Sequence, residues 1–281
     1  MNLKLNDFIL KELNFNINDV SIKTKLSGLN NECYKIEYLN TPYFIRICNK
    51  SKDMEEKNII KICAQNNIAP RLLYYSASSG NMVTEWINGH MPNEREFSSI
   101  GFIADLTTKL KTLHSLKCCK HFNPFNEIKE SLLLCEKNQL QLPTFINILI
   151  DKLKTIEYFC LENMDIGLCH NDLNPSNILI TGNDLYFIDY EFSAIGDIFY
   201  DLATLSWMMN DEGKENLLKF YFHKPTNYHY KKLAYYLYVV KFWNACWSLL
   251  KSKDNTSTYD YKKGAEMIFQ DLWQNYNYNY N

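Results

Sequence analysis

The sequence LCHNDLNPSNILI at residues 168–180, followed by YFIDYEF at residues 186–192, decides the fold of this chain. The first stretch carries Asp172 and, five residues later, Asn177, and the second stretch carries Asp189. The short apolar runs NILI and LYFI predict a β-hairpin that returns the chain and brings Asp189 to the same place. Carboxylate and amide oxygens are ligands that suit Mg²⁺. We therefore expect one loop to hold a metal ion and to present a further carboxylate.

Phosphoryl transfer from ATP is the chemistry that suits these residue types. It needs Mg²⁺ against the phosphates and an acceptor hydroxyl aimed in line, with little covalent help from the protein. Asp172 can face the acceptor, while Asn177 and Asp189 can face the metal. His170 opens the loop and can brace it through hydrogen bonds. The alternative is a polar loop in which Asp and Asn only make turns. The full HxDxxxxN spacing, with Asp189 twelve residues after the Asn, favours the catalytic interpretation.

Short β-rich runs separated by turn signals fill most of the first ninety residues. They predict an antiparallel sheet with a short amphipathic helix before it and a helix at residues 52–66. The expected strands are residues 20–26, 33–39, 43–48, 72–76 and 81–87. The sequence NGHMP at residues 88–92 is a natural hinge.

Apolar residues at helical spacing dominate the remainder of the chain, as at residues 100–113 and 145–160. The predicted fold class is therefore α+β and bilobal, with a small antiparallel N-lobe and a larger, mainly α-helical C-lobe. The expected parts are an N-lobe at residues 1–88, a C-lobe at residues 89–274 and a frayed tail at residues 275–281. Such an architecture places a ligand cleft between the lobes.

The composition excludes several classes of protein. The chain has 281 residues, 46% of them hydrophobic, and a net charge of −2, which argues against nucleic-acid binding through a basic face. Its apolar stretches fall short of the roughly 18 residues that a membrane span needs, and charges interrupt any signal-peptide core. The nine cysteines lack zinc-ligand spacing, so we expect reduced thiols and a cytoplasmic protein. The sequence leaves the oligomeric state open.

The motifs resemble those of a known family. HxDxxxxN with a later Asp looks like the catalytic core of the protein-kinase-like fold, without the HRD and DFG of protein kinases. HND at residues 170–172, IDYE at 188–191 and GDIFYDLA at 196–203 are similar to the choline/ethanolamine kinases and their aminoglycoside phosphotransferase relatives. The compact bacterial choline kinases are the most similar type. The resemblance covers residues 20–272 and implies a kinase that uses ATP and Mg²⁺ to convert choline to phosphocholine, with a role in phospholipid metabolism or surface decoration.

The resemblance also implies roles for single residues. Asp172 orients and deprotonates the acceptor hydroxyl, and His170 supports it. Asn177 and Asp189 bind Mg²⁺, and Glu191 lies beside the metal. Asp201, in the YDLA sequence, resembles a residue that caps a helix behind the catalytic loop and is expected to be structural.

Arg46 is the central residue of the expected nucleotide half. It lies in a strand between apolar neighbours, and a buried cation there needs a partner, although an exposed edge-strand position is the alternative. The resemblance implies that Arg46 contacts the phosphates and pairs with Glu56, with Glu55 as the competitor. The other expected nucleotide contacts are Gly28, Asn30 and Asn31 in a phosphate-covering loop, and Glu85 and Ile87 in the linker beside adenine.

Aromatic side chains near the C-terminus are the expected acceptor site, because a quaternary ammonium binds best to aromatic faces. By resemblance, Trp247 and Tyr261 match the choline pocket best, Trp243 is one residue out of register, and Trp207 is a further candidate. Ordinary packing is the alternative for such aromatics. Met208 stands where choline kinases commonly carry a Glu, which leaves ethanolamine or another amino alcohol open.

Three further interpretations compete with a choline kinase. An aminoglycoside phosphotransferase would need an acidic acceptor pocket, which the aromatic C-terminal region disfavours. A nucleotide-binding pseudokinase scaffold is disfavoured by the complete set of Asp172, Asn177 and Asp189. A protein kinase is disfavoured because no APE-type activation segment follows Asp189. His114, in the sequence TLHSL, is expected to be structural.

Overall fold

The computed structural model describes residues 3–26, 31–48, 53–182, 184–253 and 259–275. The chain forms two compact units, each assembled from separate stretches of sequence. The sheet unit comprises residues 1–92, 118–120 and 175–193, and the helical unit comprises residues 93–117, 121–174 and 194–281. The first division lies close to the predicted boundary after residue 88. Residues 118–120 and 175–193 belong to the sheet unit and form hydrogen bonds within it.

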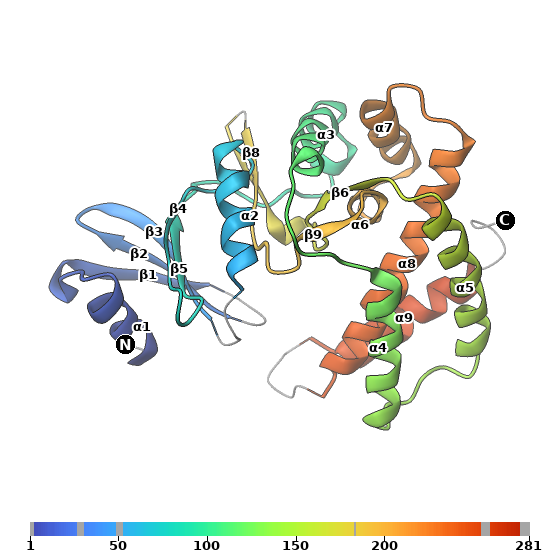
Figure 1. The fold of residues 1–281 in the computed structure, drawn as a ribbon, viewed down its shortest axis with the longest axis horizontal. Coiled ribbons are helices and arrows are strands. Elements are labelled where there is room, and N and C mark those ends of the chain that lie inside the picture. The colour runs from blue at the N-terminus through green and yellow to red at the C-terminus, as the bar shows by residue number, and fades with distance from the viewer. Residues whose placement is uncertain (1–2, 27–30, 49–52, 183, 254–258, 276–281) are drawn as a thin grey trace. The chain divides into compact units, whose positions relative to one another are not determined.

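The sheet unit contains an antiparallel sheet whose described strands run in the order β1-β2-β3-β5-β4 (Figure 1). The strands are β1 (Val20–Leu26), β2 (Glu32–Tyr38), β3 (Thr41–Ile47), β4 (Leu72–Tyr75) and β5 (Met82–Glu85). Inward side chains of alternate strand positions, such as Ile36, Ile45 and Val83, pack with Phe8 and Ile9 into one apolar core. The N-terminal helix α1 (Leu3–Asp7) and the following π-helical turn (Phe8–Glu12) form a second layer that packs against the sheet.

Helix α2 (Met54–Gln65) begins at Asp53, whose side chain accepts the main-chain N–H groups of Glu55 and Glu56. The hairpin of β7 (Ile178–Thr181) and β8 (Asp184–Phe187) joins the sheet unit through residues far away in sequence. Phe187 N–H donates to the Ile68 carbonyl at 2.7 Å, and His90 pairs with Ile180. A Cβ atom at Gly89 would lie 2.5 Å from the Ile180 carbonyl oxygen, so this close approach requires glycine.

The helical unit is built around α8, a helix of 25 residues that contacts α4, α5, α6 and α9 (Figure 1). Its described helices are α3 (Ile100–Ser115), α4 (Pro124–Lys137), α5 (Ile146–Glu162), α6 (Phe199–Ser206), α7 (Asp211–Phe222), α8 (Asn227–Lys251) and α9 (Tyr261–Gln274). The antiparallel pair β6 (Ile166–Cys169) and β9 (Ala194–Asp197) flanks the loop that carries Asp172. Buried aromatic side chains of α8, among them Tyr236, Tyr238 and Phe242, fill the core.

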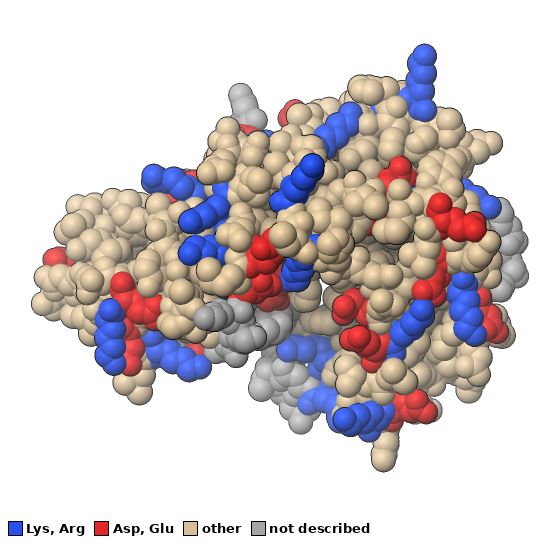
Figure 2. Space-filling view, in the orientation of Figure 1, with Lys and Arg blue, Asp and Glu red and all other residues tan. Residues whose placement is uncertain are grey.

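The surface carries charges of both signs. Among the residues drawn in colour, Figure 2 shows Lys and Arg side chains interspersed with Asp and Glu over the visible face. None of the helices in the described ranges combines the length and the hydrophobicity that a membrane crossing requires. All nine cysteines are free, and Cys119 is exposed.

Candidate active site

Asp201, in the first turn of α6, holds the loop that carries Asp172. Its two carboxylate oxygens accept the main-chain N–H groups of His170 at 2.7 Å and Asn171 at 2.8 Å. Asp201 is fully buried, and Asn171 has a positive φ of 64°, a conformation that Asn tolerates better than most residues. The expectation that Asp201 caps a helix is therefore wrong, because α6 begins after Ile198 and has no side-chain cap. The carboxylate fixes the loop backbone instead.

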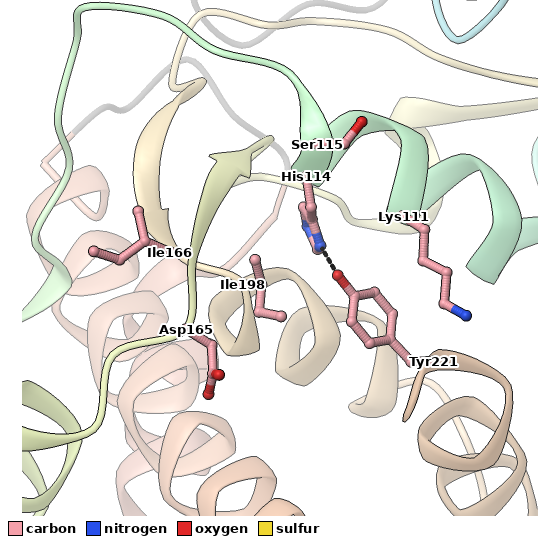
Figure 3. Close-up of a pocket in the computed structure, with 7 residues that line it drawn as sticks. All are labelled: Lys111, His114, Ser115, Asp165, Ile166, Ile198 and Tyr221. Carbon is pink, nitrogen blue, oxygen red and sulfur yellow. Dashed lines mark hydrogen bonds between the residues drawn. The ribbon is translucent and has the colours of Figure 1, made fainter. Parts of the chain in front are cut away.

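His114 extends this network to the surface of the helical unit. Its Nε2 lies 3.2 Å from Asp201 Oδ2, and its Nδ1 lies 2.8 Å from the Tyr221 hydroxyl (Figure 3). Burial, together with the nearby charges of Cys169, Asp201 and Asp165, raises the pKa of Tyr221, so its hydroxyl stays protonated. A pocket of 340 Å³ opens here, lined by Lys111, His114, Ser115, Asp165, Ile166, Ile198 and Tyr221. The structure thus gives His114 the structural role expected from the sequence.

Asp172 belongs to the helical unit and is half-buried. Its Oδ1 accepts a hydrogen bond from the Asn174 side-chain amide at 3.0 Å, and its carbonyl accepts the Asn174 main-chain N–H at 2.9 Å. Burial, together with the charges of Asp172 and Asp201, raises the pKa of Tyr200 well above its ordinary value. The sequence did not predict the hydrogen bond between Asn174 and Asp172 or the buried Tyr200 beside them. The only signal for Asn174 was its position two residues after Asp172, which an ordinary turn would equally explain.

Asn177, Asp189 and Glu191 all lie in the sheet unit. The predicted hairpin is present, and the Ile188 N–H donates to the Asn177 carbonyl at 3.0 Å, which holds the two expected metal ligands together. Asp189 has a positive φ of 65°, and its side chain is 43% exposed. Two carboxylates and one amide oxygen form a donor set of hard oxygens, which fits Mg²⁺ and suits a soft metal poorly.

Arg46 and Glu56 form a bidentate ion pair inside the sheet unit. Arg46 Nη1 and Nη2 lie 2.6 and 2.7 Å from the two Glu56 carboxylate oxygens. Their side chains are only 4% and 5% exposed, so Arg46 lies on a buried strand, and its partner is Glu56. Arg46 Nη1 also lies 3.6 Å from Asp189 Oδ1. Burial works against the guanidinium charge, but Glu56 and Asp189 raise the pKa of Arg46, so it stays charged beside the expected metal ligands.

The remaining expected nucleotide contacts are placed as follows. Asn31 is half-buried directly before β2, and Ile87 is half-buried after β5. Glu85 ends β5, and its carboxylate accepts the Arg71 main-chain N–H at 2.8 Å. Gly28 and Asn30 lie outside the described residues.

The aromatic residues expected in the acceptor site take part in two different contacts. Trp247 of α8 and Tyr261 of α9 meet edge to face, with ring centroids 5.6 Å apart at 82°. Trp243 lies one helical turn before Trp247, on the same face of α8. Trp207 instead faces Lys241, whose ammonium lies 5.7 Å from the ring centroid. Lys241 lies on α8 two positions before Trp243.

Three comparisons with known proteins find similarity to choline/ethanolamine kinases and to LicA proteins. The family model for choline/ethanolamine kinases matches residues 22–207. A LicA homologue of Mycoplasma capricolum is 29% identical over 205 residues, 71% of this chain and 79% of that protein. Choline kinase LicA from Streptococcus pneumoniae has a TM-score of 0.80 at 21% identity, covering 96% of this chain and 98% of that one. A LicA structure with AMP gives 0.74 at 19% identity, covering 97% of both chains.

The fold and the site define a small-molecule kinase of the protein-kinase-like α+β class, whose acceptor is an alcohol. Because the family model covers most of the sequence, the chain belongs to the choline/ethanolamine kinase family.

Proposed function

We propose that this protein transfers the γ-phosphoryl group of ATP to the hydroxyl of choline, with Mg²⁺, and releases phosphocholine and ADP. One structural observation carries the proposal beyond family membership. Asp189 lies 3.6 Å from the charged Arg46, and the preceding residue, Ile188, donates its main-chain N–H to the Asn177 carbonyl. Hard-oxygen metal ligands next to a buried, paired guanidinium form a site for a metal-bound polyphosphate.

Each residue has a distinct part in the proposed mechanism. Asp172 accepts the proton of the choline hydroxyl and aims its oxygen at the γ-phosphorus. Asn177, Asp189 and Glu191 would hold Mg²⁺, which when bound neutralises charge on the phosphates. Arg46 binds phosphate oxygens. The hydroxyl oxygen forms the new P–O bond as the bond to ADP breaks, and the proton leaves on Asp172.

The acceptor site rests on the aromatic pair in the helical unit. The edge-to-face contact of Trp247 and Tyr261 offers aromatic surface to a quaternary ammonium. Met208 is 43% exposed, and an apolar side chain at this position supplies no carboxylate to a cation. Choline and ethanolamine are both cations, so the missing carboxylate does not select between them, and ethanolamine is the second candidate acceptor. The free cysteines are compatible with the cytoplasmic location expected from the sequence.

The proposed function is tested by ³¹P NMR of products formed from ATP and Mg²⁺ with choline, ethanolamine or kanamycin. We expect phosphocholine to form fastest, and Asp172→Asn to lower kcat about a thousandfold because the general base is lost. Asp151→Asn, at an exposed carboxylate on α5, is the matched control and should retain full turnover.

Each other outcome of the product assay would assign a different function. Preferential formation of phosphoethanolamine would move the assignment to the second acceptor, and phosphorylated kanamycin would identify an antibiotic kinase. A protein that binds ATP but phosphorylates no acceptor would be the pseudokinase scaffold. Normal turnover by Asp172→Asn would remove Asp172 from the mechanism.

A further inference from the structure

Lys120 contacts both helix α2 and the segment that carries the expected metal ligands. Its ammonium donates to Asp53 Oδ2 at 3.0 Å and to the main-chain oxygen of Glu191 at 3.0 Å. All three residues belong to the sheet unit. Because one ammonium donates to two acceptors in separate segments, it fixes the distance between those segments.

Three acidic side chains at the start of α2 each bond to a different partner. Asp53 accepts from Lys120, Glu55 accepts the Cys119 main-chain N–H at 2.7 Å, and Glu56 pairs with Arg46. Burial opposes the charged form of Asp53, but Lys120 and the capped N–H groups outweigh it and lower the pKa of the carboxyl. The segment 118–120 therefore fixes the same helical turn that presents Glu56 to Arg46.

These contacts form a ring that is closed by the main chain between Asp189 and Glu191. Its members in order are Asp189, Arg46, Glu56, Asp53, Lys120 and Glu191. The chain just after α2 is attached to the hairpin as well, since Phe187 N–H donates to the Ile68 carbonyl. A displacement of α2 would thus be transmitted to the residues around Asp189.

We propose that Lys120 is a positioning residue, which holds the Asp189–Glu191 segment at a fixed distance from α2 and so sets the metal ligands relative to the Arg46–Glu56 pair. The inference rests on the proposed function, because it takes Asp189 and Glu191 as the residues that hold Mg²⁺. Lys120 bonds the main-chain oxygen of Glu191 and acts on the metal only through the position of that segment. Partners that orient metal ligands in this way typically govern metal affinity.

The test compares Lys120→Met, which keeps the length of the side chain but removes its donors, with Lys120→Arg, which retains donors for both acceptors. Lys117→Met, at an exposed lysine of the same loop, is the matched control. Binding of the non-hydrolysable ATP analogue AMPPNP is measured by calorimetry with and without Mg²⁺. We expect Lys120→Met to weaken the Mg²⁺-dependent part of the affinity about tenfold. Lys120→Arg should retain most of the affinity, and Lys117→Met should bind as the unaltered protein does.

If Lys120 only stabilises the fold, the binding results should differ. Lys120→Met would then lower the melting temperature, or weaken AMPPNP equally with and without Mg²⁺, and either result without a Mg²⁺-specific loss overturns the proposal. Unchanged binding by Lys120→Met overturns it too. In turnover assays, excess Mg²⁺ should restore kcat of Lys120→Met, which a misfolded site would not allow.

A second measurement separates this inference from the proposed function. Hydrogen–deuterium exchange without ligand should rise in Lys120→Met at both residues 53–57 and residues 189–193, because the ring is opened. If the unaltered protein shows no Mg²⁺-dependent nucleotide binding, the proposed function fails, and coupled exchange in both segments still supports the positioning role. Exchange that rises in one segment alone, or in neither, overturns that role whatever the activity.

Discussion

Asp189 combines the side chain of a proposed metal ligand with a left-handed backbone, and these two properties can be separated. Asn tolerates a φ of 65° better than Ala does, so Asp189→Asn removes the charge while keeping the local conformation. We expect Asp189→Asn to fold normally and to bind nucleotide with little dependence on Mg²⁺, because the carboxylate that faces the cation is lost. Calorimetric titration of AMPPNP at several Mg²⁺ concentrations measures this.

The control for this variant is Asp151→Asn, which removes an equal charge from the exposed surface of α5. An Asp189→Asn protein that keeps the full Mg²⁺ response would assign the metal to other ligands. A loss of folding in Asp189→Asn, seen by circular dichroism, would instead show that the carboxylate serves the backbone conformation.

Residues that act through their side chains were the easiest to predict from sequence. Arg46 could be placed because a charge between apolar strand residues needs a partner, and its ion pair with Glu56 is present. Asp201 and Lys120 were harder, because their partners are distant in sequence, and which groups come within reach depends on the tertiary fold. Lys120 contacts Asp53 across 67 positions of sequence, and no local pattern predicts such a pairing.

At the scale of single elements, α2 shows how a helix supplies one partner of a buried ion pair, since its Glu56 pairs with Arg46 of β3. Removing Glu56 leaves the Arg46 guanidinium buried without its partner. We expect Glu56→Gln to lower the free energy of unfolding by about 3 kcal/mol, since breaking one side of a buried ion pair is costly. Urea denaturation followed by circular dichroism measures the change, and the KM for ATP should rise with it.

Two further variants make this test specific. Glu55→Gln, one position earlier and half-exposed, should change stability far less. The double variant Arg46→Met with Glu56→Leu should recover much of the lost stability, because well-packed apolar residues often replace a buried pair without cost. A double variant no more stable than Glu56→Gln would show that the loss does not come from the unpaired charge.

The limits of the elements were predicted best where the sequence pattern is local. The expected strands at residues 33–39 and 43–48 are present as β2 and β3, but the turn between them lies at Leu39 and Asn40, which both have positive φ, as tight two-residue hairpins require. The π-helical turn at Phe8–Glu12 has no such signal, because its apolar residues fit an ordinary helix equally well. The assignment of the β7–β8 hairpin to the sheet unit also depends on distant partners.

At the scale of the whole molecule, Lys232 is a buried charge that joins distant segments of the helical unit. The fully buried ammonium lies 2.7 Å from Asp197 Oδ2 and 2.7 Å from Asp165 Oδ2, and it also contacts the Asn163 carbonyl. Burial alone would lower its pKa, but the two carboxylates raise the pKa of Lys232 above its ordinary value. One side chain of α8 thus contacts both the residue before β6, Asp165, and the last residue of β9, Asp197.

Lys232→Met should destabilise the protein by about 3 kcal/mol at neutral pH, because Asp197 is then a buried carboxylate without its cation. The loss should shrink as the pH falls. Burial already raises the pKa of Asp197 despite Lys232, and removing the cation raises it further above the unfolded value of about 3.9. A carboxyl with a raised pKa in the folded state is penalised above that pKa and relieved by protonation below it.

Urea denaturation of Lys232→Met and of the unaltered protein at pH 7 and pH 5 measures both the loss and its pH dependence. Lys231→Met, at the exposed neighbouring position, is the matched control and should change stability little at either pH. If Lys232→Met loses the same free energy of unfolding at both pH values, the loss comes from packing against Phe199, whose ring centroid lies 4.7 Å from the ammonium. A deficit that narrows at pH 5 identifies the unpaired Asp197 as its cause, since protonation changes the charge of that carboxyl and leaves the packing as it was.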